Sequence, residues 1–428
     1  MLTRPLRFAM VTTFYPPYCT DEEGHHVQRW ARALSARGHR VDVIHDTDAY
    51  RLETDHAPEV TFEKDGIRVY RLRSSRKKFS TLSAKQLGRP TTHRDRLEVL
   101  LNGRYDVIHY HNISAMGGPG IWEVGTGIKL HTAHDFWLVC PNSDLWKNGG
   151  ELCESKQCIR CTLSQRKSSQ VWRYTQELER SATHIDAFLM QSQSAADLHV
   201  QFGFQERVQI TPSIAVGAAP RLKPVSIAKP DEKLKFLFSG PLNDKQDLEQ
   251  VILTFGCVPG AELRIAGDGE QTGMLKQQCE AIENVVFLGA LSEGDLKVER
   301  KNASVIIVPY KVHEVLPVSI VEAFREGKPV LARDVGPNRE IIQKSDGGLV
   351  FASIAELQSQ IEELVHDPDQ VSEMARMAFS YFARHWKEDV VIDAYFEIIR
   401  QVAEKRGFED LIRKIDDAPT RFSVEARL

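Results

Sequence analysis

Apolar and polar positions alternate along the chain in a regular order. Short and nearly continuous apolar runs, such as LRFAMVTTF at residues 6–14, are typical of buried strands in a parallel sheet. A polar loop follows this run, and then comes a segment in which Val27, Trp30 and Leu34 recur at helical spacing. Repetition of this strand–helix order predicts α/β domains whose parallel sheets are covered on both faces.

The apolar runs fall into two series. Between them, residues 215–233 are rich in Pro, Lys and small side chains without apolar periodicity, which is typical of an interdomain linker. A chain of 428 residues is also longer than one hydrophobic core usually accommodates. We therefore predict two Rossmann-like domains, at residues 1–220 and 221–385, whose parallel sheets face each other across a cleft.

The overall composition excludes several classes of protein. Hydrophobic residues make up 42% and charged residues 27% of the chain, as in ordinary globular proteins. The net charge of −4 argues against a nucleic-acid partner, since such proteins usually carry a basic domain. No apolar run reaches the roughly 18 residues of a membrane span, and the apolar stretch near the start fits a buried strand better than a signal peptide. We expect a cytoplasmic protein.

One strand-to-helix connection has an unusual composition. After the predicted strand ASVIIVPY, a short loop holds Glu314, Pro317 suits a first helical turn, and Glu322 lies about one and a half turns further along the helix. The backbone N–H groups of Leu316 and Val318 are expected to point toward an anion at the helix start. A phosphate with a carboxylate on either side, each accepting hydrogen bonds from hydroxyls, fits a nucleotide sugar. The alternative is a solvated helix whose glutamates bind nothing.

Several segments resemble the retaining glycosyltransferases of family 4, which have the GT-B fold. In chain order they are FYPPYCTDEEGHHVQRWARALSARGHRVDV, KLHTAHD, LKFLFSGPLNDKQDL, LRIAGDGE, VVFLGALSEGDL and SVIIVPYKVHEVLPVSIVEAFREGKPVLARDVGPNREII. The last segment carries the E-x7-E pair that is the family's signature, and KLHTAHD is similar to its T-x-H-D segment. The resemblance covers most of residues 6–390.

The resemblance implies a hexosyltransferase-type enzyme. A sugar passes from a nucleotide-diphosphate donor, a UDP- or GDP-sugar, to a hydroxyl of a carbohydrate or lipid-linked acceptor, and the anomeric configuration is retained. No cofactor is required, because fixed cations and helix N-termini stabilise the departing diphosphate without a metal ion. Synthesis of a surface polysaccharide or a glycosylated metabolite is the expected context.

The motifs also imply a role for individual residues. His134 and Glu314 match the residues that act at the reacting sugar. The residues implied to bind the donor diphosphate are Gly24, Lys245, Leu316 and Val318. Glu322 and Gly267 are implied to bind the nucleotide. A terminal helix that crosses back to the first domain is expected at residues 386–408, with a tail at 409–428.

The chain departs from the family pattern at the diphosphate loop. The family usually has an Arg where this chain has Pro241, and a Gly where it has Gln246. The first loop shows Glu23-Gly24 in place of the common Gly-Gly. Two alternatives stay open, the first because the residues alone do not exclude other chemistry and the second because one of two diphosphate cations is missing. One is another GT-B enzyme, such as a nucleotide-sugar epimerase or a pseudo-glycosyltransferase, and the other is a non-catalytic scaffold that binds a nucleotide sugar.

Four cysteines lie close together in an insertion at residues 140–161. They are Cys140, Cys153, Cys158 and Cys161. In a cytoplasmic protein such spacing favours a metal site over disulfides, and a C-x2-C pair is a common half of a zinc site. A structural zinc ion is therefore predicted, with disulfides or free thiols as the alternative and an iron–sulfur cluster as the least favoured interpretation.

Two further clusters have open interpretations. Residues 71–96 are strongly basic with almost no acid, which fits either a solvated loop or a surface that contacts anionic lipid at the inner face of the membrane. His109, His111, His131 and His134 gather at the ends of two predicted strands. They suggest a metal site or simple hydrogen bonding to neighbouring loops, and only His134 belongs to a motif.

Overall fold

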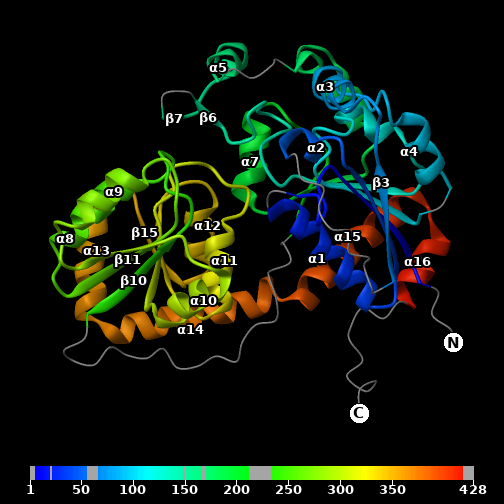
Figure 1. The fold of residues 1–428 in the computed structure, drawn as a ribbon. Coiled ribbons are helices and arrows are strands. Elements are labelled where there is room, and N and C mark those ends of the chain that lie inside the picture. The colour runs from blue at the N-terminus through cyan, green and yellow to red at the C-terminus, as the bar shows by residue number, and fades with distance from the viewer. Residues whose placement is uncertain are drawn as a thin grey trace. The chain divides into compact units, whose positions relative to one another are not determined.

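The computed structural model describes residues 5–19, 22–54, 66–103, 105–147, 150–165, 170–211 and 233–417. Its backbone divides into two compact units (Figure 1). The first unit comprises Met1–Ser143, Ser155–Ile214 and Glu388–Leu428, and the second comprises Asp144–Glu154 and Ala215–Lys387. Except for its last residue, the linker predicted at 215–233 lies outside the described residues.

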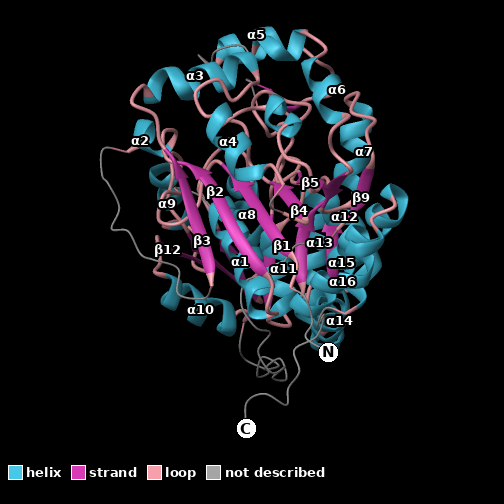
Figure 2. Ribbon diagram, turned by 90° about the vertical axis from the view of Figure 1, so that its right-hand side faces the viewer, coloured by secondary structure: helices cyan, strands magenta, loops and turns pink. Residues whose placement is uncertain are grey.

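The first unit is built on a sheet of seven described strands, all parallel, in the order β3-β2-β1-β4-β5-β8-β9 (Figure 2). This is the parallel sheet that the apolar runs predict. The strands are β1 (Arg7–Thr12), β2 (Arg40–Asp46), β3 (Ile67–Leu72), β4 (Val107–Tyr110), β5 (Ile128–Thr132), β8 (Ala187–Met190) and β9 (Val208–Ile210).

Helices complete the first unit's core because their apolar stripes pack against continuous apolar strands. Phe8 and Met10 of β1, for example, share one buried cluster with Trp30 and Leu34 of α1. The described helices are α1 (Glu22–Ala36), α2 (Tyr50–Glu53), α3 (Lys77–Leu87), α4 (Arg94–Leu101), α5 (Cys158–Ser164), α6 (Glu177–Ala182), α7 (Gln193–Gln201), α15 (Glu388–Arg406) and α16 (Glu409–Asp416), with 3-10 turns η1 (Pro119–Glu123) and η2 (Val171–Tyr174).

The second unit repeats the architecture with six described parallel strands in the order β12-β11-β10-β13-β14-β15. They are β10 (Leu234–Ser239), β11 (Ala261–Ala266), β12 (Val285–Gly289), β13 (Val305–Val308), β14 (Val330–Arg333) and β15 (Gly348–Phe351). Two buried clusters, one on each face, show that helices cover both sides. These helices are α8 (Leu248–Gly256), α9 (Thr272–Cys279), α10 (Glu293–Asn302), α11 (Val318–Arg325), α12 (Pro337–Ser345), α13 (Ile354–His366) and α14 (Pro368–His385).

The end of the chain belongs to the first unit. Tyr395 and Phe396 of α15 lie in the same buried cluster as Phe8 of β1. At the start of α15, the buried guanidinium of Arg37 donates to Glu388 at 2.8 Å and to Asp389 at 2.5 Å. Helix α16 occupies residues for which we predicted only a tail, because its apolar positions pack into the same cluster.

A short antiparallel hairpin, β6 (Trp146–Lys147) and β7 (Glu151–Leu152), is grouped with the second unit although it lies far from that unit in the sequence. The chain enters it through two non-glycine residues with positive φ, Ser143 at 71° and Leu145 at 50°. The Asp144 carboxylate accepts a hydrogen bond from the Trp146 N–H at 3.1 Å, which supports this turn.

Candidate functional site

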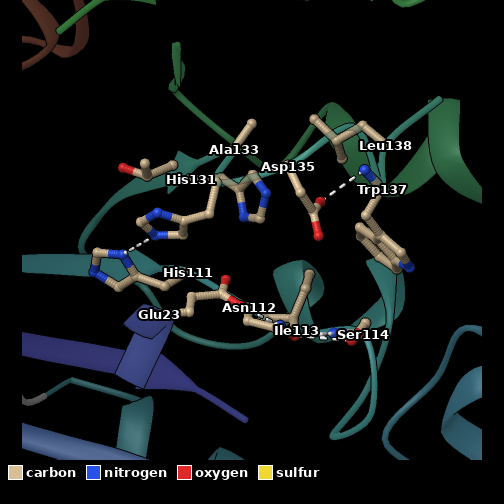
Figure 3. A pocket seen from close by; sticks show the side chains of 12 residues that line it. Glu23, His111, Asn112, Ile113, Ser114, His131, Ala133, Asp135, Trp137 and Leu138 are labelled. Atoms are coloured by element: carbon tan, nitrogen blue, oxygen red, sulfur yellow. Dashed lines mark hydrogen bonds between the residues drawn. The ribbon is translucent and has the colours of Figure 1, made fainter. Parts of the chain in front are cut away.

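A pocket opens in the first unit at the carboxyl ends of β4 and β5 (Figure 3). Parallel strands end at the same edge of a sheet, and ligands of open α/β sheets usually bind at that edge. Glu23 of α1 contributes to the wall together with residues 111–114 and most of residues 131–138. The pocket therefore combines carboxylate, amide, hydroxyl and imidazole groups from three parts of the chain.

His134, which we predicted to act at the reacting sugar, lines this pocket. Its Nε2 lies 2.9 Å from Nδ1 of His111, and the planes of the two rings are inclined by only 22°, so the rings meet edge to edge and are nearly coplanar. Burial and, to a smaller extent, the positive charge of Arg29 lower the pKa of His134 to about 3. Burial also lowers the pKa of His111 well below its ordinary value. Both rings are therefore neutral near pH 7.

The proton positions on these two rings follow from their partners. Nε2 of His111 is buried, and within the described part of the chain it has no hydrogen-bond partner. Because an orphaned buried N–H is rarer than an under-used acceptor, we infer that His111 carries its proton on Nδ1 and donates it to Nε2 of His134. His134 then carries its own proton on Nδ1 and can act as a hydrogen-bond donor.

His109 has a different position from the other three histidines of the predicted cluster. Its Nε2 lies 2.7 Å from the Thr132 hydroxyl and its Nδ1 lies 3.0 Å from the Tyr395 hydroxyl. His111, His131 and His134 line the pocket, whereas His109 is fully buried behind it. Both nitrogens of His109 thus have hydrogen-bond partners inside the protein. For this histidine the structure agrees with the interpretation of simple hydrogen bonding to neighbouring elements.

A buried cluster after β2 was not predicted from the sequence. It consists of Asp46, Asp48 and His93. Each of these side chains offers one potential metal-ligand atom, and the three atoms lie within 4.8 Å of one another, which no other group in the described part of the chain achieves. Burial raises the pKa of Asp46 to about 7. Burial acts in the same direction on Asp48, but hydrogen bonds from His93 and the Ser74 backbone lower its pKa overall. The cluster fastens the segment before α3 to the end of β2.

Gly24 lies at the start of α1. A Cβ at this position would lie 2.8 Å from Cβ of Cys19 and 3.3 Å from the Phe14 backbone, so local packing requires a glycine. The adjacent Glu23 accepts a hydrogen bond from the Asn112 amide at 2.6 Å, which joins α1 to the loop after β4. Contact of Gly24 with a phosphate stays a prediction.

In the second unit, glycines at strand ends bring three loops into contact. Gly267 follows β11, and a Cβ there would lie 1.9 Å from the carbonyl oxygen of Gly240. A Cβ on Gly240, which follows β10, would lie 2.3 Å from the hydroxyl of Tyr310, which follows β13. Only glycine allows these loops to approach so closely. The role of Gly267 in nucleotide binding stays a prediction.

Glu314 lies in the loop between β13 and α11, and most of its surface is covered by the protein. Burial raises its pKa to about 7. The pKa of the neighbouring Tyr310 is also raised, first by burial and then by the charge of Glu314. Near neutral pH the Glu314 carboxyl is therefore divided between its charged and protonated forms, and it can both accept and donate hydrogen bonds to hydroxyls.

Helix α11 begins directly after Pro317. The Ile320 and Val321 N–H groups both donate to the Pro317 carbonyl. The N–H groups that precede them at the helix start have no acceptor within the helix. Leu316 and Val318 flank this start, and Val318 is about half exposed. The helix start is thus placed as the sequence predicts, and its contact with a diphosphate stays a prediction.

Glu322, the second glutamate of the pair, is engaged in an ion pair. Its carboxylate lies 2.5 Å from the Arg300 guanidinium of α10. Both side chains are largely covered. The ion pair fixes one carboxylate oxygen, so any hydroxyl ligand must share Glu322 with Arg300.

Lysines cluster at the same edge of this sheet. Lys245 Nζ lies 2.9 Å from the Asp144 carboxylate of the hairpin. The Lys311 N–H donates to the Lys245 carbonyl at 2.8 Å, so the two lysines are neighbours on the loops after β10 and β13. Lys311 Nζ lies 3.3 Å from Asp247, which also pairs with Arg333 of β14. Each of these cations is thus matched by a carboxylate.

The departures from the family pattern have visible structural effects. Pro241 is exposed, and because its side chain carries no charge it supplies no cation at that position. Gln246 is buried and its amide oxygen accepts a hydrogen bond from the Asn243 N–H at 3.1 Å. Gln246 also forms a backbone bridge with Tyr310. The side chain that replaces the usual glycine therefore shapes the loop that carries Lys245.

The four cysteines of the insertion are divided between the units. Cys140, Cys158 and Cys161 belong to the first unit and Cys153 to the second. Cys161 accepts a hydrogen bond from the Asn142 amide at 3.3 Å. In the described part of the first unit, the sulfur atoms of these three cysteines do not all lie within 4.8 Å of one another, which is the limit that Asp46, Asp48 and His93 meet. A zinc site at the cysteines stays a prediction.

Several residues of the site were missed because their partners are distant in the sequence. Asp144 faces Lys245, and Arg300 faces Glu322, across long separations that no local pattern reports. Lys311 carries a signal that was available, since it is a basic residue directly after the β13 strand end. Its importance becomes clear only when the backbone places it beside Lys245.

Two family models match this chain. Residues 221–386 match the model described as glycosyl transferases group 1, and residues 24–213 match the model described as glycosyltransferase family 4. The first range contains the six described strands of the second unit's sheet, and the second range contains the described strands of the first unit's sheet except β1. Together they include His134, Lys245, Glu314 and Glu322.

Individual relatives agree with the family models. A glycosyltransferase of Methanocaldococcus jannaschii is 27% identical over 367 residues, which cover 80% of this chain and 84% of the relative. Sucrose-phosphate synthase from Thermosynechococcus elongatus superimposes with a TM-score of 0.65 at 16% identity, over 95% of this chain and all of that one. Anabaena HepE, in complex with UDP and glucose, gives a TM-score of 0.57 at 15% identity, over 94% of this chain and all of HepE.

Proposed function

Because the chain belongs to the group 1 and family 4 type of glycosyltransferases with the GT-B fold, we propose that it is a retaining hexosyltransferase. It moves a sugar from a nucleotide diphosphate to an acceptor hydroxyl and requires no metal ion for transfer. One observation carries this proposal. Lys245, Glu314 and the start of α11 lie on loops that follow the paired strands β10 and β13, at one edge of one sheet.

Lys245 and the start of α11 take the charge that leaves with the diphosphate. When the bond between the sugar and the diphosphate breaks, negative charge grows on the phosphate oxygens while the sugar becomes oxocarbenium-like. A lysine ammonium and unpaired helix N–H groups are suitable donors for these oxygens. The Asp144 carboxylate accepts a hydrogen bond from Lys245 at 2.9 Å, so the diphosphate has to replace a carboxylate there.

Lys311 supplies the second cation that Pro241 cannot provide. Its backbone is hydrogen-bonded to that of Lys245, and its side chain is partly exposed beside Asp247. Two ammonium groups on adjacent loops suit the two phosphates of a diphosphate. This assignment explains how the family's reaction can proceed in a chain that lacks the usual arginine.

The two glutamates hold hydroxyls at opposite ends of the donor. Glu314, with a pKa raised to about 7 by burial, contacts the transferred sugar and can accept or donate hydrogen bonds. Glu322 binds the ribose hydroxyls with the carboxylate oxygen that Arg300 does not hold. This division follows from their positions before and within α11.

His134 acts on the sugar as a neutral hydrogen-bond donor. Its low pKa, caused by burial, prevents it from serving as a cationic acid near pH 7. Its proton on Nδ1, fixed by the hydrogen bond with His111, supports a positioning contact with a sugar hydroxyl. The first unit therefore contributes orientation, and the second contributes charge.

The donor and acceptor complete the proposal. A UDP- or GDP-sugar is proposed as the donor, and the UDP and glucose in the HepE structure support this class of ligand. A carbohydrate or lipid-linked hydroxyl is proposed as the acceptor, in surface polysaccharide or glycosylated-metabolite synthesis in the cytoplasm. The epimerase and scaffold alternatives are not favoured, since the matched families and relatives are glycosyltransferases.

A panel of nucleotide sugars tests the proposal. Thermal shift with UDP-, GDP-, ADP- and TDP-sugars is expected to raise the melting temperature for one nucleotide class, since a ligand that binds only the folded chain stabilises it. The binding donor is then incubated with candidate acceptors, and NMR of the product is expected to show the anomeric configuration of the donor. No shift with any nucleotide sugar, or an inverted product, would contradict the assignment.

A structural zinc ion at the four cysteines is a separate proposal. Metal analysis of the purified chain is expected to give about one equivalent of zinc, bound by the thiolates. Substitution of Cys158 and Cys161 by serine is expected to abolish it, whereas substitution of the exposed Cys257 leaves it unchanged. Zinc well below one equivalent in the unmodified chain rejects this proposal without affecting the transferase assignment.

A further inference from the structure

Helix α3 has its apolar side chains on the wrong face for a helix that only packs against its own unit. The buried residues of α3 are Ser80, Thr81, Ser83 and Ala84, which are small and mostly polar. Phe79, Leu82 and Leu87 of the same helix are 56%, 53% and 51% exposed. A helix on a globular protein usually turns its large apolar residues inward. In α3 this arrangement is inverted.

Hydrogen bonds hold the inward face of α3 in place. The Ser80 hydroxyl lies 2.5 Å from that of Thr92 and 3.2 Å from Nε2 of His93, and the Ser83 hydroxyl lies 2.5 Å from that of Thr91. Rotation of α3 to bury its apolar residues would break these contacts and leave buried hydroxyls unpaired. The outward direction of Phe79 and Leu82 is therefore fixed by the local structure.

The outward face is also basic. Arg76, Lys78 and Lys85 are exposed, and none of the ion pairs within the described residues involves them. Residues 73–94 contain seven Lys or Arg residues and no Asp or Glu. Figures 1 and 2 both show α3 at the outer border of the first unit. Exposed apolar side chains between unpaired cations are typical of helices that lie in a membrane interface.

We propose that the outward face of α3 binds the surface of an anionic lipid bilayer. Phe79 and Leu82 enter the boundary between headgroups and acyl chains, while Lys78 and Lys85 contact anionic headgroups. The charge of this face selects the occupant, because an anionic surface complements it. None of the described helices has the length and apolar composition needed to cross a bilayer, so the contact is peripheral. It does not depend on the proposed transferase activity.

Helix α3 and the His134 pocket lie at the same edge of the first unit's sheet. Helix α3 follows the carboxyl end of β3, and the His134 pocket lies at the carboxyl ends of β4 and β5 in the same parallel sheet. A membrane bound by α3 therefore meets the edge of the sheet that carries the pocket. An acceptor hydroxyl on a lipid headgroup would reach that pocket without leaving the bilayer surface.

Vesicle flotation tests the proposal with the whole chain of 428 residues. The unmodified protein is expected to float with phosphatidylcholine vesicles that contain 30 mol% phosphatidylglycerol and not with phosphatidylcholine alone, and 0.5 M salt is expected to reduce the bound fraction. The double variant Phe79→Ser/Leu82→Ser is expected to reduce the partition coefficient at least tenfold. The double variant Lys78→Gln/Lys85→Gln is expected to reduce it by about tenfold on anionic vesicles.

Matched controls separate this surface from general exposure and charge. Leu253 of α8 is 48% exposed, and Lys276 of α9 is also exposed, so Leu253→Ser and Lys276→Gln are expected to float like the unmodified chain. All variants change surface residues and are expected to keep the melting temperature. The proposal is overturned if the unmodified protein does not float with anionic vesicles, or if Phe79→Ser/Leu82→Ser floats equally well.

Discussion

The pocket of the first unit and the strand-end loops of the second differ in how their polar groups are satisfied. In the first unit, His111 and His134 are neutral and bond to each other. In the second, Lys245 and Lys311 are charged and each is matched by a carboxylate of the protein. In the first unit burial keeps the polar groups of the site neutral, and in the second unit ion pairs hold the charged groups of the site in position.

This difference implies different costs when a ligand binds. A neutral hydrogen-bonded pair keeps its arrangement, so the first unit presents a preformed donor. In the second unit a phosphate has to replace the carboxylate of Asp144 or Asp247 in an existing ion pair. The free energy of that ion pair is lost and reduces the net free energy of binding. Changes to charged residues in the second unit should therefore have larger and more selective effects than changes elsewhere.

The largest effect is expected from removing Lys245. Lys245→Ala should lower kcat/KM for the donor by roughly 10²–10³, because it deletes a cation that stabilises the departing diphosphate. Steady-state kinetics with the nucleotide sugar identified by thermal shift measures this. Lys245→Arg should recover part of the loss. Near-normal turnover by Lys245→Ala would remove the lysine from the mechanism.

The second effect concerns the stability of the fold at different pH. Folding raises the pKa of Glu314 from 4.5 to about 7, so the ionised carboxyl is less favourable in the folded chain than in the unfolded chain. Below pH 4.5 the group is protonated in both states and the free energy of unfolding is not reduced. As the pH rises from 4.5 through 7, the free energy of unfolding falls. The penalty above pH 7 amounts to at most about 3 kcal/mol. Glu314→Gln should therefore raise the melting temperature at pH 8 and change it little at pH 4.5, while transfer activity falls. An equal shift at both pH values would contradict the raised pKa.

The third effect tests whether Lys311 replaces the missing arginine. Lys311→Met should weaken UDP or GDP binding about tenfold, which is about 1.4 kcal/mol, and leave the corresponding monophosphate nearly unchanged. Isothermal titration calorimetry measures both. Lys344→Met is a matched control, because Lys344 is an exposed lysine paired with Glu340 in the same unit. If the unmodified chain binds the diphosphate and Lys311→Met binds it equally well, Lys311 is not the second cation.

The smallest effect comes from the carboxylate that occupies Lys245. Asp144→Asn should tighten diphosphate binding about threefold to tenfold, since a charge that competes with the ligand is removed. The same change in a Lys245→Ala background should have no such effect, because the competition acts through that lysine. Weaker binding by Asp144→Asn would show that Asp144 supports the site in place of competing for it.

Much of the fold could be predicted because its signals are local. The continuous apolar runs, the helical spacing of Trp30 and Leu34, and the Pro317 helix start were all visible in the sequence and correspond to β1, α1 and α11. The GT-B fold and the glycosyltransferase family were likewise indicated by short motifs at strand ends. Helix α16 was missed although its signal is local, since its buried Leu411 and Ile415 are spaced as on one face of a helix.

The rest of the site depends on contacts that the sequence does not report. Burial raises the pKa of Glu314, and only the packed structure shows how much it is covered. The Asp144–Lys245 and Arg300–Glu322 pairs join residues from separate elements. The inverted face of α3 also needed the structure, because composition alone left open whether residues 71–96 are a solvated loop.

The return of α15 to the first unit has a consequence for synthesis on the ribosome. Its buried residues complete the cluster that contains Phe8, yet they are translated only after the whole second unit. The second unit can close as soon as residue 387 has emerged from the exit tunnel. The first unit, although its strands are made before those of the second unit, keeps an apolar surface uncovered until α15 has emerged as well, and such transiently exposed apolar surface is what chaperones bind.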